Sequence, residues 1–481
     1  MKEKKIFDAL TNIDDEFIEE TRKQISQKKK KKLIRRTALA ASVIIVVGAG
    51  LIWTTIIGKN DNPKAPQVVQ GGGATQSPSK SNAAGKQIMA VKYPKANAFG
   101  DTDTSEKYSN SVDASFLKAV NQFAYKTTTD IFAKSSGNIN YSPVSLYYAL
   151  SLASTGANGT TESEMLSLLG ADSKEELSMH CKNLYRCLFF DNKIGKLRIG
   201  NSLWMNKEIV WKNRFINNAA KNLYTATFSV DFANKNASKL MSDWVSKNTG
   251  GTIEPQINPD PNQVLSIINT IYFYDQWSTG FDKELNSKDV FYLANGKTVD
   301  CDFMNATYPS GGYVKGNGYV RSDLNLKNNN RMVFILPDAN VSARELLSSP
   351  KKMQSMFEGG TEDYGKIVWT VPKFKFGSDL KLNNVLQTLG IKSAFEENAD
   401  FSGITDSPAW ISSLHQQTHI GIDENGVEAS AFTQINMAGS SMPHDTIEMN
   451  LNRPFIYGIL SNDNTILFVG VCENPTSHSA Q

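Results

Sequence analysis

The hydrophobic and polar positions along this chain follow two different periods. Between residues 112 and 133 the apolar residues Phe116, Val120 and Phe123 recur at helical spacing, which predicts a helix. Apolar residues run almost without a break through residues 264–274, and such a run predicts a strand buried on both faces. The same reasoning predicts helices at residues 162–169, 174–190 and 215–224, and strands at residues 197–206, 332–336, 367–376, 454–460 and 465–471. Helices before and between many strands predict an α+β fold with a large, mixed central sheet.

A further predicted helix begins where the short strand-like run 138–141 ends. Ser142 can cap this helix by accepting a hydrogen bond from an N–H group of the first turn. Pro143 has a fixed φ that suits the first helical position. The sequence therefore predicts a strand that leads directly into a helix ending near residue 157.

Residues 421–450 combine the pattern of a strand with the composition of a loop. From Val427 onward every second residue is small or apolar and the residues between are mostly polar, as in a strand with one buried face. The alternation leads into Ala-Gly-Ser-Ser at 438–441, which suits an exposed loop. No proline between Gly426 and Met442 prevents pairing as a central strand. We infer two states, one outside a sheet and one inserted into it; an ordinary β-hairpin is the alternative.

The first 57 residues contain a basic segment followed by an apolar one. Residues 37–57 carry no charge, and a helix of this length spans roughly 31 Å, enough to cross the hydrocarbon core of a bilayer. Lys and Arg cluster just before it, and Trp53 lies near its far end, as an interfacial aromatic residue would. Residues 1–36 are therefore predicted to be a short basic cytoplasmic segment, and residues 37–57 a single transmembrane helix. A cleaved signal peptide is the alternative, although its basic region would be unusually long.

The composition changes again after the apolar segment. Residues 58–90 are rich in Asn, Pro, Gly, Ser and Gln, which predicts a flexible linker with an r.m.s. reach on the order of 30 Å. A large domain is predicted at residues 91–476. Under this topology it lies outside the cell, attached to the cell membrane by the linker.

Charge and motifs argue against several classes of function. Residues 1–36 carry 12 Lys and Arg against 7 Asp and Glu, whereas the remaining residues carry 39 against 41. The large domain is thus close to neutral, which argues against a nucleic-acid partner. The four cysteines have no metal-ligand spacing, and no metal or cofactor is predicted. The chain has no G-x-S-x-G, H-E-x-x-H, Walker or G-x-G-x-x-G motif, so an enzyme is not expected.

Several motifs occur in one order that is typical of a known family. Residues 422–431, IDENGVEASA, resemble the hinge of the reactive-centre loop of serpins, and Arg453-Pro454-Phe455 follows as it does in that family. Other segments that are similar to serpin landmarks are NSLW at 201–204, WVSKNT at 244–249, NTIYF at 269–273, ILPD at 335–338, VPKF at 371–374, ADFSG at 399–403 and LFVG at 467–470. The chain therefore resembles a membrane-anchored, bacterial-type serpin from about residue 112 to residue 475.

The resemblance implies a fold and a set of functional positions. The implied fold has three β-sheets, eight to nine helices and an exposed reactive-centre loop that inserts into the largest sheet. The implied hinge residues are Glu424, Gly426, Val427, Glu428, Ala429, Ser430 and Ala431. The implied hydrogen-bonded network beneath the sheet, the shutter, consists of Ser142, Ser145, Asn269 and Gln416, and Trp277 is assigned to the breach of the sheet.

The chain departs from the family at the shutter. Gln416 stands where serpins usually carry a histidine, and His415 lies beside it. Because a glutamine amide both donates and accepts hydrogen bonds, it can complete the network, but the pH response of a histidine at this position is not expected. Packing in the core is the alternative role for these residues.

The position of the reactive bond follows from two counts. Counting fourteen residues forward from Gly426 places the bond between Ser440 and Ser441. Counting back from Phe455 by the usual spacing leads nearer to Pro443, which makes Met442 the second choice for the residue before the bond. Residues 437–440 contain no Lys, Arg or aromatic residue. A subtilisin-like or elastase-like protease is therefore the predicted target, and a trypsin-like one is not.

The favoured function is suicide inhibition of a serine protease, with a cysteine protease as a further possible target, by a monomeric protein. The cut loop would insert into the sheet and carry the protease with it. A non-inhibitory serpin-like binding or structural protein is the alternative. Such a protein would normally have a proline or a charge among the hinge residues that face the sheet, and this chain has neither at Val427, Ala429 and Ala431.

Overall fold

The computed structural model describes most of the large domain. The described residues are 84–96, 99, 111–412, 414–427 and 445–477. The chain separates into two units, Met1–Pro78 and Ser79–Gln481, and all described residues belong to the second. The predicted cytoplasmic segment 1–36, the predicted membrane span 37–57 and most of the predicted linker lie outside the described residues. No helix within the described ranges is both long and apolar enough to span a bilayer.

The first of two sheets, here called the main sheet, has eight strands. Its order is β1-β5-β4-β6-β14-β13-β12, with β3 beside β4. The strands are β1 (Gly85–Met89), β3 (Phe190–Asp191), β4 (Gly195–Asn206), β5 (Thr225–Val230), β6 (Leu265–Gln276), β12 (Phe374–Lys381), β13 (His415–Asp423) and β14 (Gly426–Val427). Only the β4–β5 pair is parallel among these described pairings, so the predicted mixed central sheet is confirmed.

The second sheet has nine strands in the order β15-β11-β8-β9-β10-β16-β17-β2, with β7 beside β8. The strands are β2 (Ile139–Tyr141), β7 (Ser287–Tyr292), β8 (Thr298–Gly316), β9 (Tyr319–Asn325), β10 (Arg331–Pro337), β11 (Asp363–Pro372), β15 (Thr446–Asn450), β16 (Phe455–Leu460) and β17 (Ile466–Cys472). Three sheets were predicted, but the described residues form two. The reason is the 19-residue strand β8, which pairs with β7 and β11 over most of its length and with β9 at its end.

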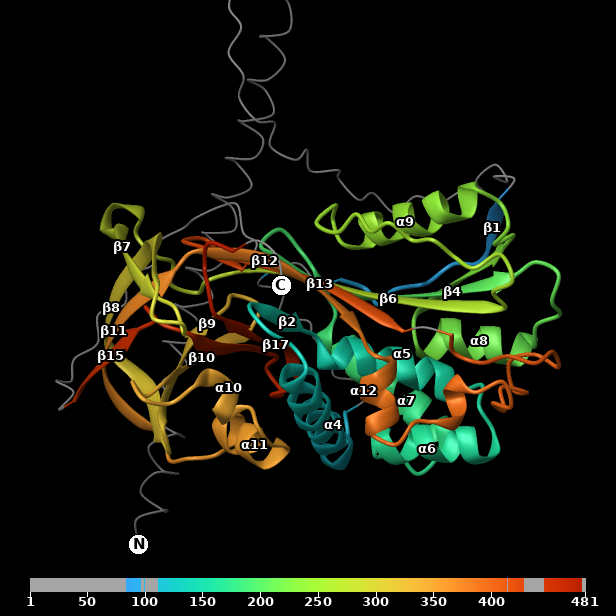
Figure 1. Cartoon of the computed structure of the whole chain (residues 1–481), viewed down its shortest axis with the longest axis horizontal. Coiled ribbons are helices and arrows are strands. Elements are labelled where there is room, and N and C mark those ends of the chain that lie inside the picture. The colour runs from blue at the N-terminus through green and yellow to red at the C-terminus, as the bar shows by residue number, and fades with distance from the viewer. Residues whose placement is uncertain (1–83, 97–98, 100–110, 413, 428–444, 478–481) are drawn as a thin grey trace, which may run out of the picture. The chain divides into compact units, whose positions relative to one another are not determined.

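Nine α-helices lie within the described residues, in agreement with the predicted eight to nine. They are α4 (Ala114–Ala133), α5 (Pro143–Ser154), α6 (Gly159–Leu169), α7 (Lys174–Leu188), α8 (Asn213–Asn222), α9 (Asn236–Asn248), α10 (Ala343–Leu346), α11 (Pro350–Glu358) and α12 (Asn383–Thr388). Two 3₁₀ turns are η1 (Lys283–Leu285) and η2 (Ser393–Phe395). Helices α5 to α8 cover one face of the main sheet, and α9 lies on the opposite face (Figure 1).

Helix α5 begins where the sequence predicts it and forms the centre of the helical layer. The Ser142 hydroxyl accepts a hydrogen bond from the Ser145 N–H at 3.4 Å, and Pro143 is the first helical residue. All twelve residues of α5 are buried. A helix that is surrounded by other elements on every side needs no polar face, and the three serines of α5 each have a hydrogen-bond partner inside the protein.

The predicted boundary of the linker is wrong. Residues 58–90 were assigned to the linker, yet Ala84 is buried and β1 pairs antiparallel with β5 at the edge of the main sheet. Most of β1 is exposed, so its sequence carries little hydrophobic signal. Its place in the fold depends on backbone hydrogen bonds to β5, which composition does not reveal.

The strand prediction for residues 264–274 needs a second correction. Leu265 to Asn269, at the start of β6, are only half-buried, although the sequence predicted burial on both faces. On the side away from β4, this part of β6 has no neighbouring strand among the described residues.

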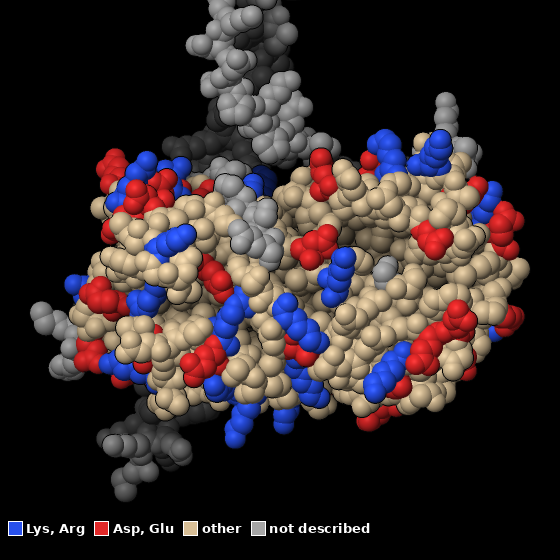
Figure 2. All heavy atoms as spheres, viewed as in Figure 1, with Lys and Arg blue, Asp and Glu red and all other residues tan. Residues whose placement is uncertain are grey.

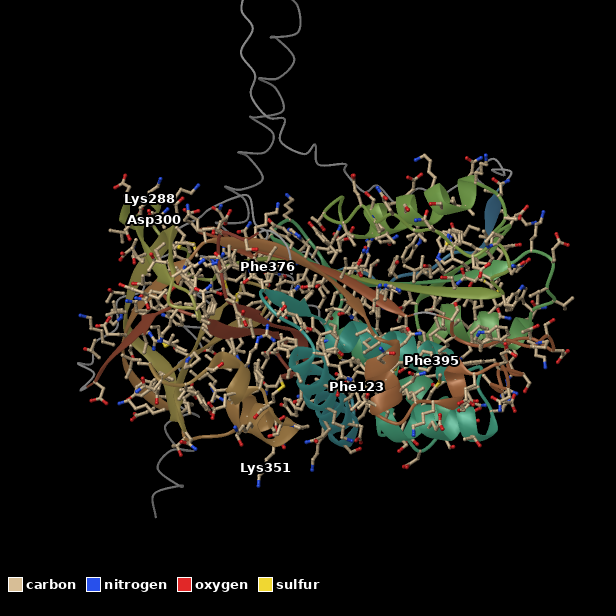
Figure 3. The ribbon with its side chains drawn as sticks, in the orientation of Figure 1. Phe123, Lys288, Asp300, Lys351, Phe376 and Phe395 are labelled. Atoms are coloured by element: carbon tan, nitrogen blue, oxygen red, sulfur yellow. The ribbon has the colours of Figure 1, made fainter. Side chains whose placement is uncertain are left out.

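The side chains of the large domain separate into buried and exposed ones. Phe123 of α4 and Phe376 of β12 lie inside, whereas Lys351 of α11 projects outward (Figure 3).

The charged side chains show no single-sign patch on the face in view. Lys and Arg side chains are interspersed with Asp and Glu side chains across this face (Figure 2). The distribution on this face fits the near-neutral charge of the large domain.

Candidate functional site

The hinge of the predicted loop lies within the main sheet. Gly426 pairs with Gln276 of β6 on one side and with Asp423 on the other. Val427 pairs with Asp275 and with Ile422, and its side chain is 2% exposed. The two residues of β14 therefore form a short strand between β6 and β13.

A seam continues along the sheet beyond β14. Residues 265–274 of β6 pair with β4 on one side, and residues 415–421 of β13 pair with β12 on the other. Within the described part of the chain, no strand pairs with these residues across the seam, because β6 is joined to β13 only through β14. The seam thus offers two facing strand edges whose backbone groups can pair with an added strand.

Three successive carbonyl groups hold the turn that precedes Gly426. The Trp277 indole Nε1–H donates to the Asp423 carbonyl at 2.8 Å, and the Trp277 backbone N–H donates to the Asn425 carbonyl at 3.0 Å. The Phe281 N–H donates to the Glu424 carbonyl at 3.2 Å. Trp277 is 1% exposed, so the predicted breach residue acts as a buried anchor beneath the hinge turn.

The carboxylate of Glu424 adds a charged contact to this anchor. Lys373 Nζ lies 2.7 Å from Glu424 Oε1, and Asn286 Nδ2 also donates to this oxygen. Burial alone would raise the pKa of Glu424, but the hydrogen bonds from Lys373 and Asn286 outweigh it and hold this pKa below its usual value. Sequence reasoning found Glu424 but missed Lys373, since the two are far apart in the chain.

Asp275 is a buried carboxylate directly opposite Val427, and sequence reasoning missed it. Its oxygens accept hydrogen bonds from the Asn328 side chain at 2.8 Å, the Asn328 N–H at 3.2 Å and Asn330 Nδ2 at 3.1 Å. Burial raises the pKa of Asp275 to about 6 despite these hydrogen bonds. An acidic residue inside the apolar run 264–276 was the available signal, since a buried charge usually has an organised environment.

The four predicted shutter residues form two separate contacts. Gln416 and Ser142 exchange two hydrogen bonds: the Ser142 N–H donates to Gln416 Oε1 at 2.9 Å, and Gln416 Nε2 donates to the Ser142 carbonyl at 2.8 Å. The Ser145 hydroxyl donates to Asn269 Oδ1, and Asn269 Nδ2 donates to Asn201 Oδ1 at 2.6 Å. Helix α5 is thereby bonded to β13 through one pair and to β6 through the other.

A further polar contact joins β2 to the β12–β13 side of the seam. The Asn140 N–H donates to the Ser378 hydroxyl at 2.9 Å, and the Thr418 hydroxyl donates to the Asn140 carbonyl at 2.9 Å. The Tyr457 hydroxyl donates to Asn140 Oδ1 at 3.0 Å. All four residues are buried, so these bonds are made in a low-dielectric interior where each unmet partner would be costly.

The remaining predicted site residues lie outside the described residues. They are Glu428, Ala429, Ser430 and Ala431 of the hinge, and Ser440, Ser441, Met442 and Pro443 around the predicted bond. The described chain resumes at Asp445 and enters β15, which pairs parallel with β11. No group of three or more His, Cys, Asp or Glu residues in the described part of the chain is arranged to hold a metal ion.

Comparison with known proteins places this geometry in a family. A family model described as "Serpin (serine protease inhibitor)" matches residues 118–475. Serpin A3-8 of Bos taurus is 28% identical over 384 residues, covering 76% of this chain and 90% of that protein. The crystal structure of tengpin, a thermophilic serpin in the native state, superposes with a TM-score of 0.71 at 25% identity and covers 82% of this chain and 100% of that one.

A second solved structure with the same fold has a small molecule bound. Thyroxine-binding globulin in complex with thyroxine superposes with a TM-score of 0.66 at 26% identity, covering 75% of this chain and 99% of that one. The family model extends over more than half of the sequence. The predicted family, though not the membrane-anchored, bacterial-type qualifier, is confirmed, and the chain belongs to the serpin family.

Proposed function

We propose that the protein is a suicide inhibitor of a serine protease, whose cut reactive-centre loop inserts into the seam of the main sheet. The observation that carries this proposal is the position of β14. Two residues of the loop already pair as a strand between β6 and β13, at the head of the seam. Insertion of the following residues would extend β14 along the same two edges.

The chemistry of trapping belongs to the protease, and the inhibitor supplies the conformational change. The protease attacks a carbonyl of the loop and forms an acyl-enzyme, which breaks the chain at that point. The segment that begins at Gly426 is then free at its far end. Each residue added to the seam satisfies backbone N–H and C=O groups of β6 and β13, so the fold itself drives the insertion before the acyl-enzyme is hydrolysed.

The side chains of the loop suit this movement. Val427 is 2% exposed and faces the larger hydrophobic core, so Ala429, Ala431 and Thr433 would face the same core once the strand continues. These residues are small or uncharged, and a charge at the same positions would be buried without a partner. Phe432 has the opposite direction and would face outward.

The proposed target protease and the proposed attachment to the cell membrane rest on sequence outside the described residues. A bond between Ser440 and Ser441, with Met442 as reserve before the bond, presents no Lys, Arg or aromatic residue, which supports a subtilisin-like or elastase-like serine protease. Residues 37–57 would anchor a monomeric inhibitor to the cell membrane, with residues 1–36 inside and the serpin domain outside. Protease shaving of intact cells should release the domain; a protected domain would contradict this orientation.

The central experiment is a test for a covalent complex. The full-length protein is incubated with subtilisin, elastase and trypsin, and the products are run on a denaturing gel. We expect a band larger than either protein with subtilisin or elastase and none with trypsin. Ala431→Glu is the matched control, because it should be cleaved without forming the complex.

A binding protein is the second candidate, and one comparison favours it. The structure described as thyroxine-binding globulin bound to thyroxine has the same fold, so the fold alone does not require inhibition. Cleavage of the wild-type loop by every protease tested, with no complex and no gain in thermal stability after cleavage, would support this alternative over inhibition.

A further inference from the structure

Residues 84–96, here called the strap, run along the edge of the main sheet. The Asp231 N–H donates to the Ala84 carbonyl at 2.9 Å, and β1 then pairs antiparallel with β5. Val91, a few residues later, packs against both hydrophobic clusters, one on each face of the main sheet. The strap therefore closes an edge that would otherwise expose β5 and the two cores beside it.

Near the end of the strap, Tyr93 packs against two aromatic rings and one arginine. Its ring stacks on Phe189 with a centroid distance of 5.9 Å and an interplanar angle of 4°, and on Tyr185 at 6.4 Å. The guanidinium carbon of Arg198 lies 4.7 Å from the centroid of the same ring. Tyr185 belongs to α7 and Phe189 directly follows it, whereas Arg198 belongs to β4. One side chain of the strap thus contacts both the helical layer and the main sheet.

The contact between α7 and β4 that Tyr93 covers, here called the α7–β4 joint, also contains a hydrogen bond. The Tyr185 hydroxyl donates to the Ile199 carbonyl of β4 at 2.8 Å, next to Arg198. Stacking of Tyr93 on Tyr185 and contact of Tyr93 with Arg198 therefore reinforce the same α7–β4 joint from the outside. Any movement of β4 relative to α7 separates these groups.

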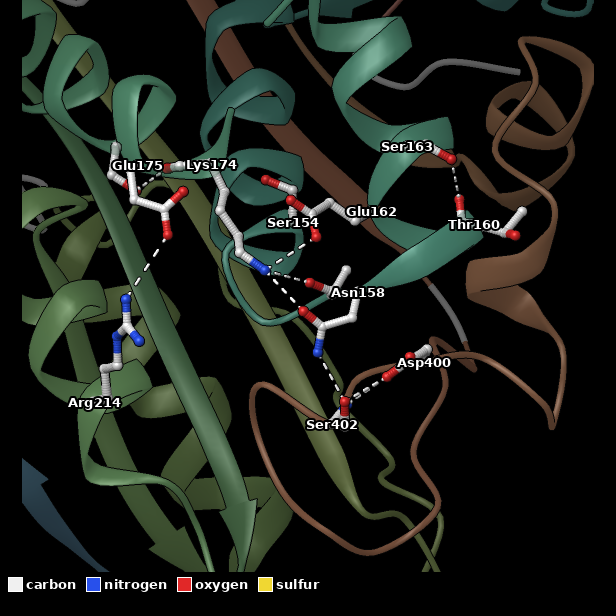
Figure 4. Close-up of polar contacts among 12 residues, drawn as sticks. Ser154, Asn158, Thr160, Glu162, Ser163, Lys174, Glu175, Arg214, Asp400 and Ser402 are labelled. Atoms are coloured by element: carbon white, nitrogen blue, oxygen red, sulfur yellow. Dashed lines mark hydrogen bonds and ion pairs between the residues drawn. The ribbon is translucent and has the colours of Figure 1, made fainter. Parts of the chain in front are cut away.

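Helix α7 is bonded to helix α5, which lies beneath the seam. The Tyr148 hydroxyl of α5 donates to the Cys181 carbonyl of α7 at 2.6 Å. Lys174 Nζ, at the start of α7, donates to the Ala157 carbonyl at 2.8 Å and to Asn158 Oδ1 at 2.9 Å, in the turn that follows α5 (Figure 4). Helix α5 is in turn bonded to β13 through the paired hydrogen bonds of Ser142 and Gln416.

Opening the seam therefore strains the strap. Helix α5 is bonded to both edges of the seam, to β13 through Ser142 and Gln416 and to β6 through Ser145, so widening the gap shifts at least one edge relative to α5. Where β6, β4 and β5 are the strands that shift, β4 moves relative to α7, which is bonded to α5. We propose that the strap holds β4 to α7 in the uncut protein and so slows spontaneous insertion of the intact loop. This inference rests on the proposed inhibitory function, and it assigns to residues near the predicted tether a direct effect on the lifetime of the active state.

The experiment measures how fast the intact inhibitor loses activity. Full-length Tyr93→Ala and wild type are held at 37 °C, and samples are tested at intervals for covalent complex with subtilisin. Because two aromatic contacts and one cation–π contact are lost, we expect the variant to lose activity about tenfold faster or more. Lys92→Ala, at an exposed neighbouring position, is the control and should match wild type. Tyr93→Phe keeps the stacked ring and should restore most of the lifetime.

A second variant tests the other end of the strap. A Cβ atom on Gly85 would lie 2.8 Å from the Ser229 carbonyl oxygen and 3.3 Å from Leu240 of α9, so Gly85→Leu should displace β1 from β5. We expect it to shorten the lifetime as Tyr93→Ala does. Equal lifetimes for wild type, Gly85→Leu and Tyr93→Ala, with normal complexes at time zero, would overturn the strap. Absence of any complex at time zero in wild type would instead overturn the proposed function, and the two failures are thus distinguishable.

Discussion

Asp275 offers a quantitative test of how the hinge region is built. It is fully buried opposite Val427, and burial raises its pKa to about 6. We expect that Asp275→Asn makes the stability of the uncut protein less dependent on pH. The ionised carboxylate loses its hydration inside the sheet, and the donors of Gln276, Asn328 and Asn330 replace that hydration only in part.

The sign and size of the effect follow from the two pKa values of Asp275. Its pKa in the folded protein, about 6, exceeds the ordinary value of 3.8 that applies to the unfolded chain. Asp275 therefore contributes stability that is complete below pH 3.8 and is lost as the pH rises through 6. The whole effect is roughly 3 kcal/mol, and roughly 2 kcal/mol of it is lost between about pH 4.5 and pH 7.5.

The assay compares urea unfolding of wild type and Asp275→Asn at these two pH values, followed by tryptophan fluorescence. Taking the difference between the two proteins removes the contribution of other titrating groups. Wild type should lose about 2 kcal/mol relative to the variant at the higher pH. Asp406→Asn, at a side chain that is 89% exposed, controls for removal of a negative charge. A difference between wild type and Asp275→Asn that is the same at both pH values would refute the buried-charge reasoning.

Further predictions concern the loop and its anchor. If the proposed inhibition holds, Ala429→Arg should be cleaved without forming a complex on a denaturing gel, because insertion would bury an unpaired charge, whereas Phe432→Glu should still form the complex. Mass spectrometry after reaction with subtilisin should find a C-terminal fragment that begins at Ser441; a stable complex cut after a Lys or Arg would contradict this. Glu424→Gln removes the charge that Lys373 contacts at 2.7 Å and should lower the unfolding free energy in urea by about 1–3 kcal/mol, and an unchanged urea midpoint would argue against this anchor.

The parts of the fold that the sequence predicts well are those whose pattern is set by local burial. Helix α5 begins at Pro143 as its cap and proline indicate, and α7 ends within two residues of the predicted position. The edge strand β1 was missed because its partner β5 is more than a hundred residues away and its own side chains are mostly exposed. The two-sheet arrangement was missed because it depends on one strand, β8, that changes partners along its length.

The sequence likewise predicts only part of the candidate site. The part that it misses bears on which loop residues can vary without disturbing the turn before Gly426. The motif located Trp277 and Glu424, but the groups that fix the turn are mostly backbone carbonyls, which every sequence has. Trp277 and Phe281 hold the carbonyls of residues 423–425 whatever side chains the loop carries further on. Residues near the predicted bond are therefore free to suit a protease without disturbing the anchor. The inward-facing hinge positions are not free, since each side chain must fit the hydrophobic core beneath the sheet when the strand inserts between β6 and β13.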